Sequence, residues 1–187
     1  MRLSKILLFL FLFQIHDAHL DAYLDYKSPF HPTISEYGMV VSQNLESSEI
    51  GTMILESGGN AVDAAVAVGF SLTTTLPRAG NIGGGGFMLV YIKETEELFS
   101  IDYRSRSSLN SNLKDLFGSK SPAQIQDDDY DLTKYDYKAS AVPGTVYGLL
   151  EAHERFGDLP LEKVLQPVID QARNGIIVSY DLHNAIG

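Results

Sequence analysis

The sequence contains no cysteine among its 187 residues. Disulfide bonds, thiolate metal sites and a cysteine nucleophile are therefore excluded. Basic residues are also in the minority, with 14 Lys and Arg against 24 Asp and Glu, which gives a formal net charge of −10. Because an acidic chain is repelled by phosphate groups, we expect no nucleic-acid partner and no binding to an anionic membrane surface.

A hydrophobic run long enough to span a bilayer is missing from the amino terminus. Residues 6–15 read ILLFLFLFQI, a run of about ten residues, which is too short to cross a membrane. Arg2 and Lys5 precede it, and a positive start followed by a short apolar core is typical of a secretory signal peptide. We therefore expect no stable membrane span and a periplasmic or secreted protein. An uncleaved N-terminal membrane anchor is the alternative.

These features give a division of the chain into parts. We assign residues 1–22 to a signal peptide and residues 23–37 to a loose lead-in that contains Pro29 and Pro32. Residues 38–187 form the folded part, which is long enough for one modest domain.

Patterns that bind phosphate or calcium are absent as well. Gly83–Gly86 form a glycine-rich loop, but G-x-G-x-x-G fails in every register and no Gly-Lys-Ser/Thr follows. The loop also runs from a helix to a strand, whereas phosphate-binding loops run from a strand to a helix. The acidic run Asp127–Asp129 lacks the central glycine and final glutamate of a calcium loop. We expect no cofactor and no metal.

The most informative stretch that is present is a predicted buried helix. Asn60 is a good N-cap, and Asp63 stands where a carboxylate favours the positive end of a helix. Residues 61–72 are almost all small or apolar, which is typical of a helix that is covered on every side. Pro77 ends the helix, and the glycines that follow predict a tight turn into a strand.

Other elements follow from hydrophobic spacing and from the positions of Pro and Gly. The predicted helices cover residues 47–57, 143–156 and 160–174, and the predicted strands cover residues 38–43, 87–92 and 98–103, with a hairpin turn at 93–97. We place His153 on the solvated surface of its helix, with no catalytic partner.

Several ordered blocks of the chain have the spacing of one known family. They read GMVVS at 38–42, NAVDAAVA at 60–67, GNIGGGGFML at 80–89, IDYR at 101–104, VPGTV at 142–146 and IVS at 177–179. In these blocks the chain resembles the first part of the large subunit of γ-glutamyltranspeptidases, which are also called glutathione hydrolases. The resemblance covers nearly all of the chain after the predicted signal peptide. It implies that residues 38–187 are the N-terminal part of the large subunit and an incomplete domain.

The resemblance implies an α+β fold, namely the N-terminal segment of an αββα sandwich of the N-terminal nucleophile (Ntn) hydrolases. Such an enzyme cleaves the γ-glutamyl bond of glutathione and passes the γ-glutamyl group to water or to an amino acid. The attacking threonine becomes the first residue of the small subunit after self-cleavage and lies in a Thr-Thr-His stretch. That stretch is absent here, since Thr73–Thr75 are followed by Leu76. We therefore name no catalytic residue, and we expect the chain alone to be inactive.

Arg104 is the candidate substrate-binding residue. A guanidinium binds a carboxylate through two parallel hydrogen bonds, and the resemblance implies that Arg104 holds the α-carboxylate of the γ-glutamyl group. Taken by itself, the residue is better explained by an ordinary salt bridge, for example to Asp102, and only the resemblance favours substrate binding. The next residues depart from the family's usual Glu and Thr/Met-Ala-Pro, because Ser105–Ser108 read SRSS. Arg106 is thus a second candidate guanidinium without a counterpart in the family.

The expected partners are glutathione or another γ-glutamyl substrate and the small subunit of the same precursor. Two other functions remain open at this point. One is a cephalosporin-acylase-like Ntn amidase, which shares the fold but takes other acyl groups. The other is a non-catalytic, truncated remnant that has kept the scaffold.

Overall fold

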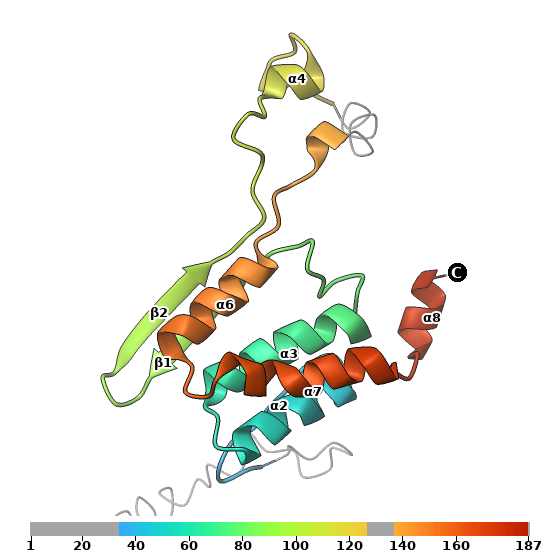
Figure 1. The fold of residues 1–187 in the computed structure, drawn as a ribbon. Helices are drawn as coiled ribbons and strands as arrows, with labels where there is room; N and C mark the ends of the chain where they lie inside the picture. Colours follow the sequence, from blue (N-terminus) through green and yellow to red (C-terminus); the bar gives the residue numbers. More distant parts are fainter. Residues whose placement is uncertain (1–33, 127–136, 187) are drawn as a thin grey trace, which may run out of the picture. The chain divides into compact units, whose positions relative to one another are not determined.

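A computed structural model describes residues 34–126 and 137–186 of the chain. It distinguishes two units, residues 1–37 and residues 38–187. All the helices and strands below belong to the second unit (Figure 1). The predicted signal peptide, the lead-in as far as residue 33, and the acidic run at 127–129 lie outside the described residues.

The second unit combines helices with one β-hairpin. Its helices are α2 (Leu45–Glu56), α3 (Ala61–Thr75), α4 (Leu113–Phe117), α6 (Thr145–Phe156), α7 (Leu161–Asn174) and α8 (Tyr180–Ile186), with 3₁₀ turns η2 (Pro122–Gln124) and η3 (Tyr137–Ala139). The hairpin is formed by β1 (Phe87–Ile92) and β2 (Glu97–Asp102). The mixed helix and sheet content confirms the predicted α+β class.

Helix α3 is the centre of the helical packing, as its sequence predicts. It contacts α2, α6 and α7, and these neighbours surround it in Figure 1. Val66 and Ala67 of α3 are fully buried against the equally buried Ala152 of α6 and Val164 of α7, all within one apolar core. Small residues allow these close approaches. A side-chain carbon added at Gly69 would lie 2.9 Å from Leu149 Cδ2.

The start of α3 has the predicted capping arrangement. Asn60 Oδ1 accepts hydrogen bonds from the N–H groups of Val62 and Asp63, at 2.8 and 3.0 Å. In return, Asp63 Oδ2 accepts a hydrogen bond from the Asn60 N–H at 3.0 Å. This reciprocal capping box satisfies N–H groups that the first turn of a helix leaves free.

The hairpin has one covered and one open face. Its strands pair antiparallel from Phe87 opposite Asp102 to Ile92 opposite Glu97. Val90 and Ile101 are buried and belong to the core. Side chains alternate between the two faces of a strand, and the opposite face exposes large apolar side chains, with Phe87 64%, Leu89 71%, Tyr91 60% and Leu98 66% accessible.

The predicted strand at 38–43 is wrong. A strand exists only through hydrogen bonds to a neighbour, and in the part of the chain that is described the only sheet is β1–β2. Residues 38–42 are therefore irregular. Val40 packs against the core, whereas Met39 and Val41 are 52% and 80% exposed.

Candidate functional site

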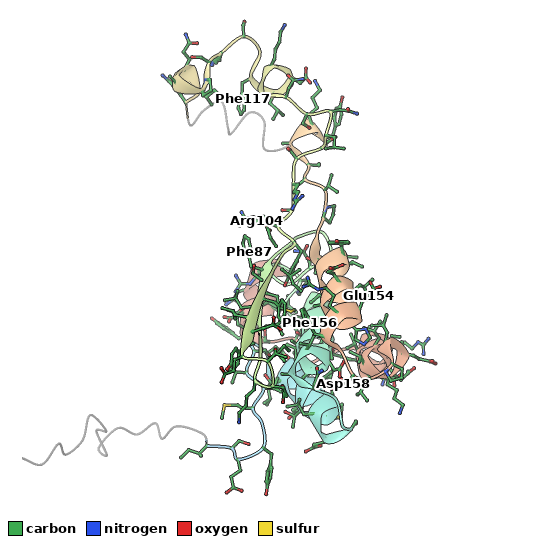
Figure 2. All side chains as sticks on the ribbon, turned by 90° about the vertical axis from the view of Figure 1, so that its left-hand side faces the viewer. Phe87, Arg104, Phe117, Glu154, Phe156 and Asp158 are labelled. Atoms are coloured by element: carbon green, nitrogen blue, oxygen red, sulfur yellow. The ribbon has the colours of Figure 1, made fainter. Side chains whose placement is uncertain are left out.

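Arg104 follows the end of β2 and lies at the same end of the hairpin as Phe87 (Figure 2). Its side chain is exposed. Its backbone N–H donates a hydrogen bond to Asp102 Oδ1 at 3.0 Å. Within residues 34–126 and 137–186, the guanidinium itself has no hydrogen bond or ion pair. The contact between Arg104 and Asp102 is therefore made by the backbone, and the salt bridge that the sequence left open is not formed.

The glycine-rich loop packs directly on the backbone around Arg104. Gly86 and Tyr103 exchange N–H···O hydrogen bonds of 3.3 and 3.1 Å, which extends the β1–β2 ladder by one pair. A side-chain carbon at Gly85 would lie 2.5 Å from the Tyr103 carbonyl oxygen and would also overlap the Ser105 nitrogen. No residue with a side chain fits at Gly85 without moving this segment.

The residues at and before the start of α6 are hydrogen-bonded both to the glycine-rich loop and to the segment around Arg104. Gly84 O accepts hydrogen bonds from the N–H groups of Gly144 and Thr145, at 2.8 and 3.2 Å. Further along, Arg106 and Val142 exchange backbone hydrogen bonds of 3.2 and 2.7 Å. The main chain at 103–106 is thus fixed between the glycine loop and the residues that lead into α6. A fixed backbone with an uncommitted guanidinium is suited to bind a carboxylate from outside.

Tyr103 is the half-buried neighbour of Arg104. Its side chain packs against the hydrophobic core. Burial raises the pKa of its phenol above the ordinary value of 10.0, because the charged phenolate is less well solvated there.

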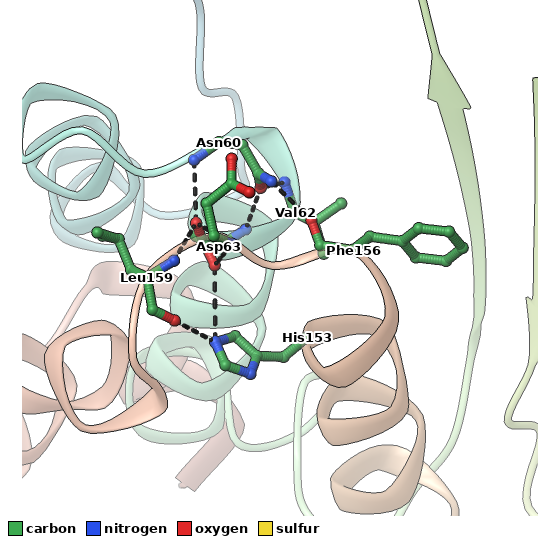
Figure 3. Close-up of polar contacts among 7 residues, drawn as sticks. Asn60, Val62, Asp63, His153, Phe156 and Leu159 are labelled. Atoms are coloured by element: carbon green, nitrogen blue, oxygen red, sulfur yellow. Dashed lines mark hydrogen bonds and ion pairs between the residues drawn. The ribbon is translucent and has the colours of Figure 1, made fainter. Parts of the chain in front are cut away.

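A second polar cluster lies at the start of α3 (Figure 3). The Asp63 side chain is fully buried. Besides the Asn60 N–H, its carboxylate accepts hydrogen bonds from the backbone N–H groups of Asp158, at 3.1 and 3.2 Å, and of Leu159, at 3.2 Å. Asn60 Nδ2 donates to Phe156 O at 2.6 Å. The cluster joins the start of α3 to the turn between α6 and α7.

His153 belongs to this cluster, so its predicted position on a solvated helix surface is wrong. Its side chain is only 15% exposed, and Nε2 lies 3.6 Å from Asp63 Oδ1 and 2.8 Å from Leu159 O. The sequence did contain a signal. Asp63 is a charged residue on an otherwise apolar, buried helix, and a buried charge requires partners. The donors here are mostly backbone groups, so we assign the cluster a structural role.

An open groove of about 770 Å³ runs between the start of α3, the hairpin and the end of α6. Its lining residues include Ala61 and Ala65 of α3, Phe99 of β2 and Phe156 of α6. Arg104 is not among its lining residues.

In the described part of the chain, no group of three His, Asp or Glu residues is placed to hold a metal ion. No described helix has the length and apolar character to cross a membrane.

Comparison with known proteins gives the family. The sequence model of the γ-glutamyltranspeptidase family matches residues 47–187. The chain belongs to the γ-glutamyltranspeptidase family. It is 43% identical over 150 residues to the glutathione hydrolase proenzyme of Escherichia coli strain K12. The aligned residues make up 80% of this chain and 25% of the relative. The chain therefore spans about a quarter of the length of this curated relative.

Solved structures support the same assignment. The crystal structure of the Helicobacter pylori γ-glutamyltranspeptidase matches with a TM-score of 0.72 at 33% identity, over 83% of this chain and 43% of that one. The crystal structure of the cephalosporin acylase from Bacillus halodurans matches with a TM-score of 0.64 at 27% identity, over 85% of this chain and 29% of the acylase chain. The expected family and fold are confirmed: the described residues form part of the Ntn-hydrolase fold of an enzyme family.

Proposed function

We propose that this chain acts as the N-terminal part of the large subunit of a glutathione hydrolase, and that Arg104 binds the α-carboxylate of the γ-glutamyl group. The observation that carries the proposal is the state of Arg104. Its backbone is held on both sides, while its exposed guanidinium has no partner in the described residues. It also lies in the IDYR block that matches the family.

In this proposal the chain positions the substrate and the small subunit performs the chemistry. The hydroxyl of the small subunit's first threonine attacks the γ-carbonyl carbon, and the threonine's own α-amine takes the proton. The C–N bond breaks, the leaving amine takes a proton, and the γ-glutamyl group remains as an ester on the threonine. Water or an amino acid then attacks the ester. Arg104 contributes by holding the carboxylate, which fixes the distance between the γ-carbonyl and the hydroxyl.

A hybrid proenzyme tests the proposal. Residues 38–187 replace the aligned segment of the Escherichia coli glutathione hydrolase proenzyme, which keeps the remainder of that relative. We expect the hybrid to cleave itself into two subunits and to release p-nitroaniline from γ-glutamyl-p-nitroanilide. A hybrid that cleaves itself but does not turn over this substrate would contradict the proposed function. A hybrid that aggregates without cleavage would show that the two segments are not equivalent.

A cephalosporin-acylase-like activity is the second candidate, because the chain is also 34% identical over 167 residues to the acylase ACY 1 proenzyme of Pseudomonas sp. strain V22. Glutaryl-p-nitroanilide distinguishes the two, since it keeps a terminal carboxylate but lacks the α-ammonium group. Preference for the γ-glutamyl substrate supports the hydrolase, and preference for the glutaryl substrate supports the acylase.

The non-catalytic alternative has a direct test at the level of the gene. A reading frame that continues beyond codon 187 to a Thr-Thr-His stretch supports an enzyme, and a stop codon at that point supports a remnant.

We further propose export, on the basis of Arg2, Lys5 and the apolar run at 6–15. A variant with Leu8→Arg in this run is expected to stay in the cytoplasm, and cell fractionation measures its location.

A further inference from the structure

We infer that Gly148, inside α6, is a positioning residue for substrate: it accepts the Tyr103 ring against the helix backbone and thereby fixes the direction of Arg104. The inference rests on the proposed role of Arg104. It assigns a part in substrate binding to a glycine that does not touch the substrate.

The first step is the contact between Tyr103 and α6. Gly148 is buried, and a side-chain carbon built on it would overlap Cβ, Cγ and Cδ1 of Tyr103. The root of the tyrosine side chain therefore occupies the volume that any other residue at position 148 would fill. Gly144, one turn earlier, has the same relation to the Tyr103 carbonyl oxygen. Gly144, the N-cap of α6, and Gly148 inside the helix thus form a slot that receives Tyr103.

The second step is the contact at the other end of the ring. Gly86 lies opposite Tyr103 in the extended ladder, and a carbon built on Gly86 would lie 2.8 Å from Tyr103 Cε2 and 3.0 Å from the hydroxyl oxygen. An aromatic ring that covers a cross-strand glycine stabilises a strand end that otherwise has no side chain to pack. The ring is therefore held at its root by Gly148 and at its tip by Gly86.

The third step connects the ring to Arg104. Along an extended segment, successive side chains point to opposite faces. The exposure of residues 101–104 follows this rule, since Ile101 is buried, Asp102 exposed, Tyr103 half-buried and Arg104 exposed. A one-residue slip would exchange the two faces. Seating Tyr103 on α6 therefore directs Arg104 away from the core, toward the side on which a substrate can reach it.

The variant Gly148→Ala in the hybrid proenzyme tests the inference. Alanine favours a helix over glycine, so a purely local effect would not harm α6, but its methyl group must displace the Tyr103 ring. We expect KM for γ-glutamyl-p-nitroanilide to rise tenfold or more, while kcat stays within threefold because the nucleophile lies on the other subunit. Self-cleavage is expected to continue.

Gly69→Ala is the matched control. Gly69 is a glycine of α3 at the α6 interface, but its added carbon would meet the side chain of Leu149 and not Tyr103. We expect KM to stay within twofold of the unsubstituted hybrid. An equal rise in KM for Gly69→Ala would show that loosened helix packing is the cause, and would overturn the inference.

Tyr103→Leu serves where Gly148→Ala fails to fold, because it removes the ring without adding volume to α6. It is expected to raise KM in the same way, because the contact of the ring with Gly86 is lost. An unchanged KM for Tyr103→Leu or for folded Gly148→Ala overturns the inference while leaving the proposed function intact. No turnover by the unsubstituted hybrid rejects the proposed function, and the inference with it.

Discussion

The Asp63 carboxylate at the start of α3 lies 3.6 Å from Nε2 of His153 near the end of α6, in the interior of the helical packing. Nε2 is also 2.8 Å from the Leu159 carbonyl oxygen, which can only accept a hydrogen bond, so Nε2 carries a proton in this arrangement. Both residues thus hold the turn between α6 and α7 against α3. This turn lies at the far end of α6 from the residues that pack on Tyr103.

Asp63→Asn is expected to destabilise the fold strongly. The carboxylate accepts hydrogen bonds from three backbone N–H groups. The asparagine side chain replaces one accepting oxygen with an NH2 group, which is itself a donor and faces these donors. Loss of buried hydrogen bonds to a charged group predicts a fall of about 3 kcal/mol in the free energy of unfolding. Chemical unfolding of the hybrid proenzyme measures the change. Asp158→Asn is the control, because Asp158 is exposed and joins the cluster only through its backbone. Equal effects of the two substitutions would contradict this account.

Arg104→Lys and Arg104→Ala test the carboxylate site. Lysine keeps the charge but loses the two parallel hydrogen bonds, and alanine loses both. Hydrogen bonds to charged groups predict a rise in KM for γ-glutamyl-p-nitroanilide of roughly tenfold for lysine and on the order of a hundredfold for alanine. Steady-state kinetics of the hybrid proenzyme give these values, and self-cleavage is expected to be unaffected. Arg173→Gln, an exposed arginine near the end of α7, is expected to change neither constant. If Arg104→Ala has the same KM as the unsubstituted hybrid, Arg104 does not bind the substrate.

The sequence predicted α2, α3, α6, α7 and the hairpin, because their signals are local, but it did not predict the short helices α4 and α8. The Asn60 cap, the alanine-rich run after it and the glycines that follow specify α3 and the turn before β1 without reference to distant residues. Arg104 could be chosen from its family block. The contacts of His153 and Tyr103 could not be predicted, since they depend on which helix faces which segment. The prediction of a strand at 38–43 failed for a related reason. The apolar residues there fit a strand, but a strand forms only when a neighbouring strand is available to pair with it.

Tyr103→Phe tests whether the hydroxyl matters or only the ring. The contacts of Tyr103 with Gly148 involve ring and Cβ atoms, so KM is expected to stay unchanged. Stability at high pH is expected to change. Because burial raises the pKa of the phenol above 10.0, the folded protein holds this proton more tightly than the unfolded chain. Its contribution to stability is present below pH 10 and is lost as the pH rises through the raised pKa. The variant should therefore lose less stability than the unsubstituted hybrid above pH 10, in unfolding experiments across that range.

The open face of the hairpin predicts how residues 23–187 behave when they are expressed alone. Leu89 and Tyr91 are 71% and 60% exposed on this face, and exposed apolar patches favour association between copies. We expect this segment to be largely insoluble and inactive toward γ-glutamyl-p-nitroanilide. Leu89→Lys is expected to raise its soluble fraction, because a charge on an exposed strand opposes pairing with another chain. Lys93→Glu is the control, since it alters charge at the hairpin turn and leaves the apolar face intact. A soluble, monomeric segment without any substitution would show that this face does not cause association.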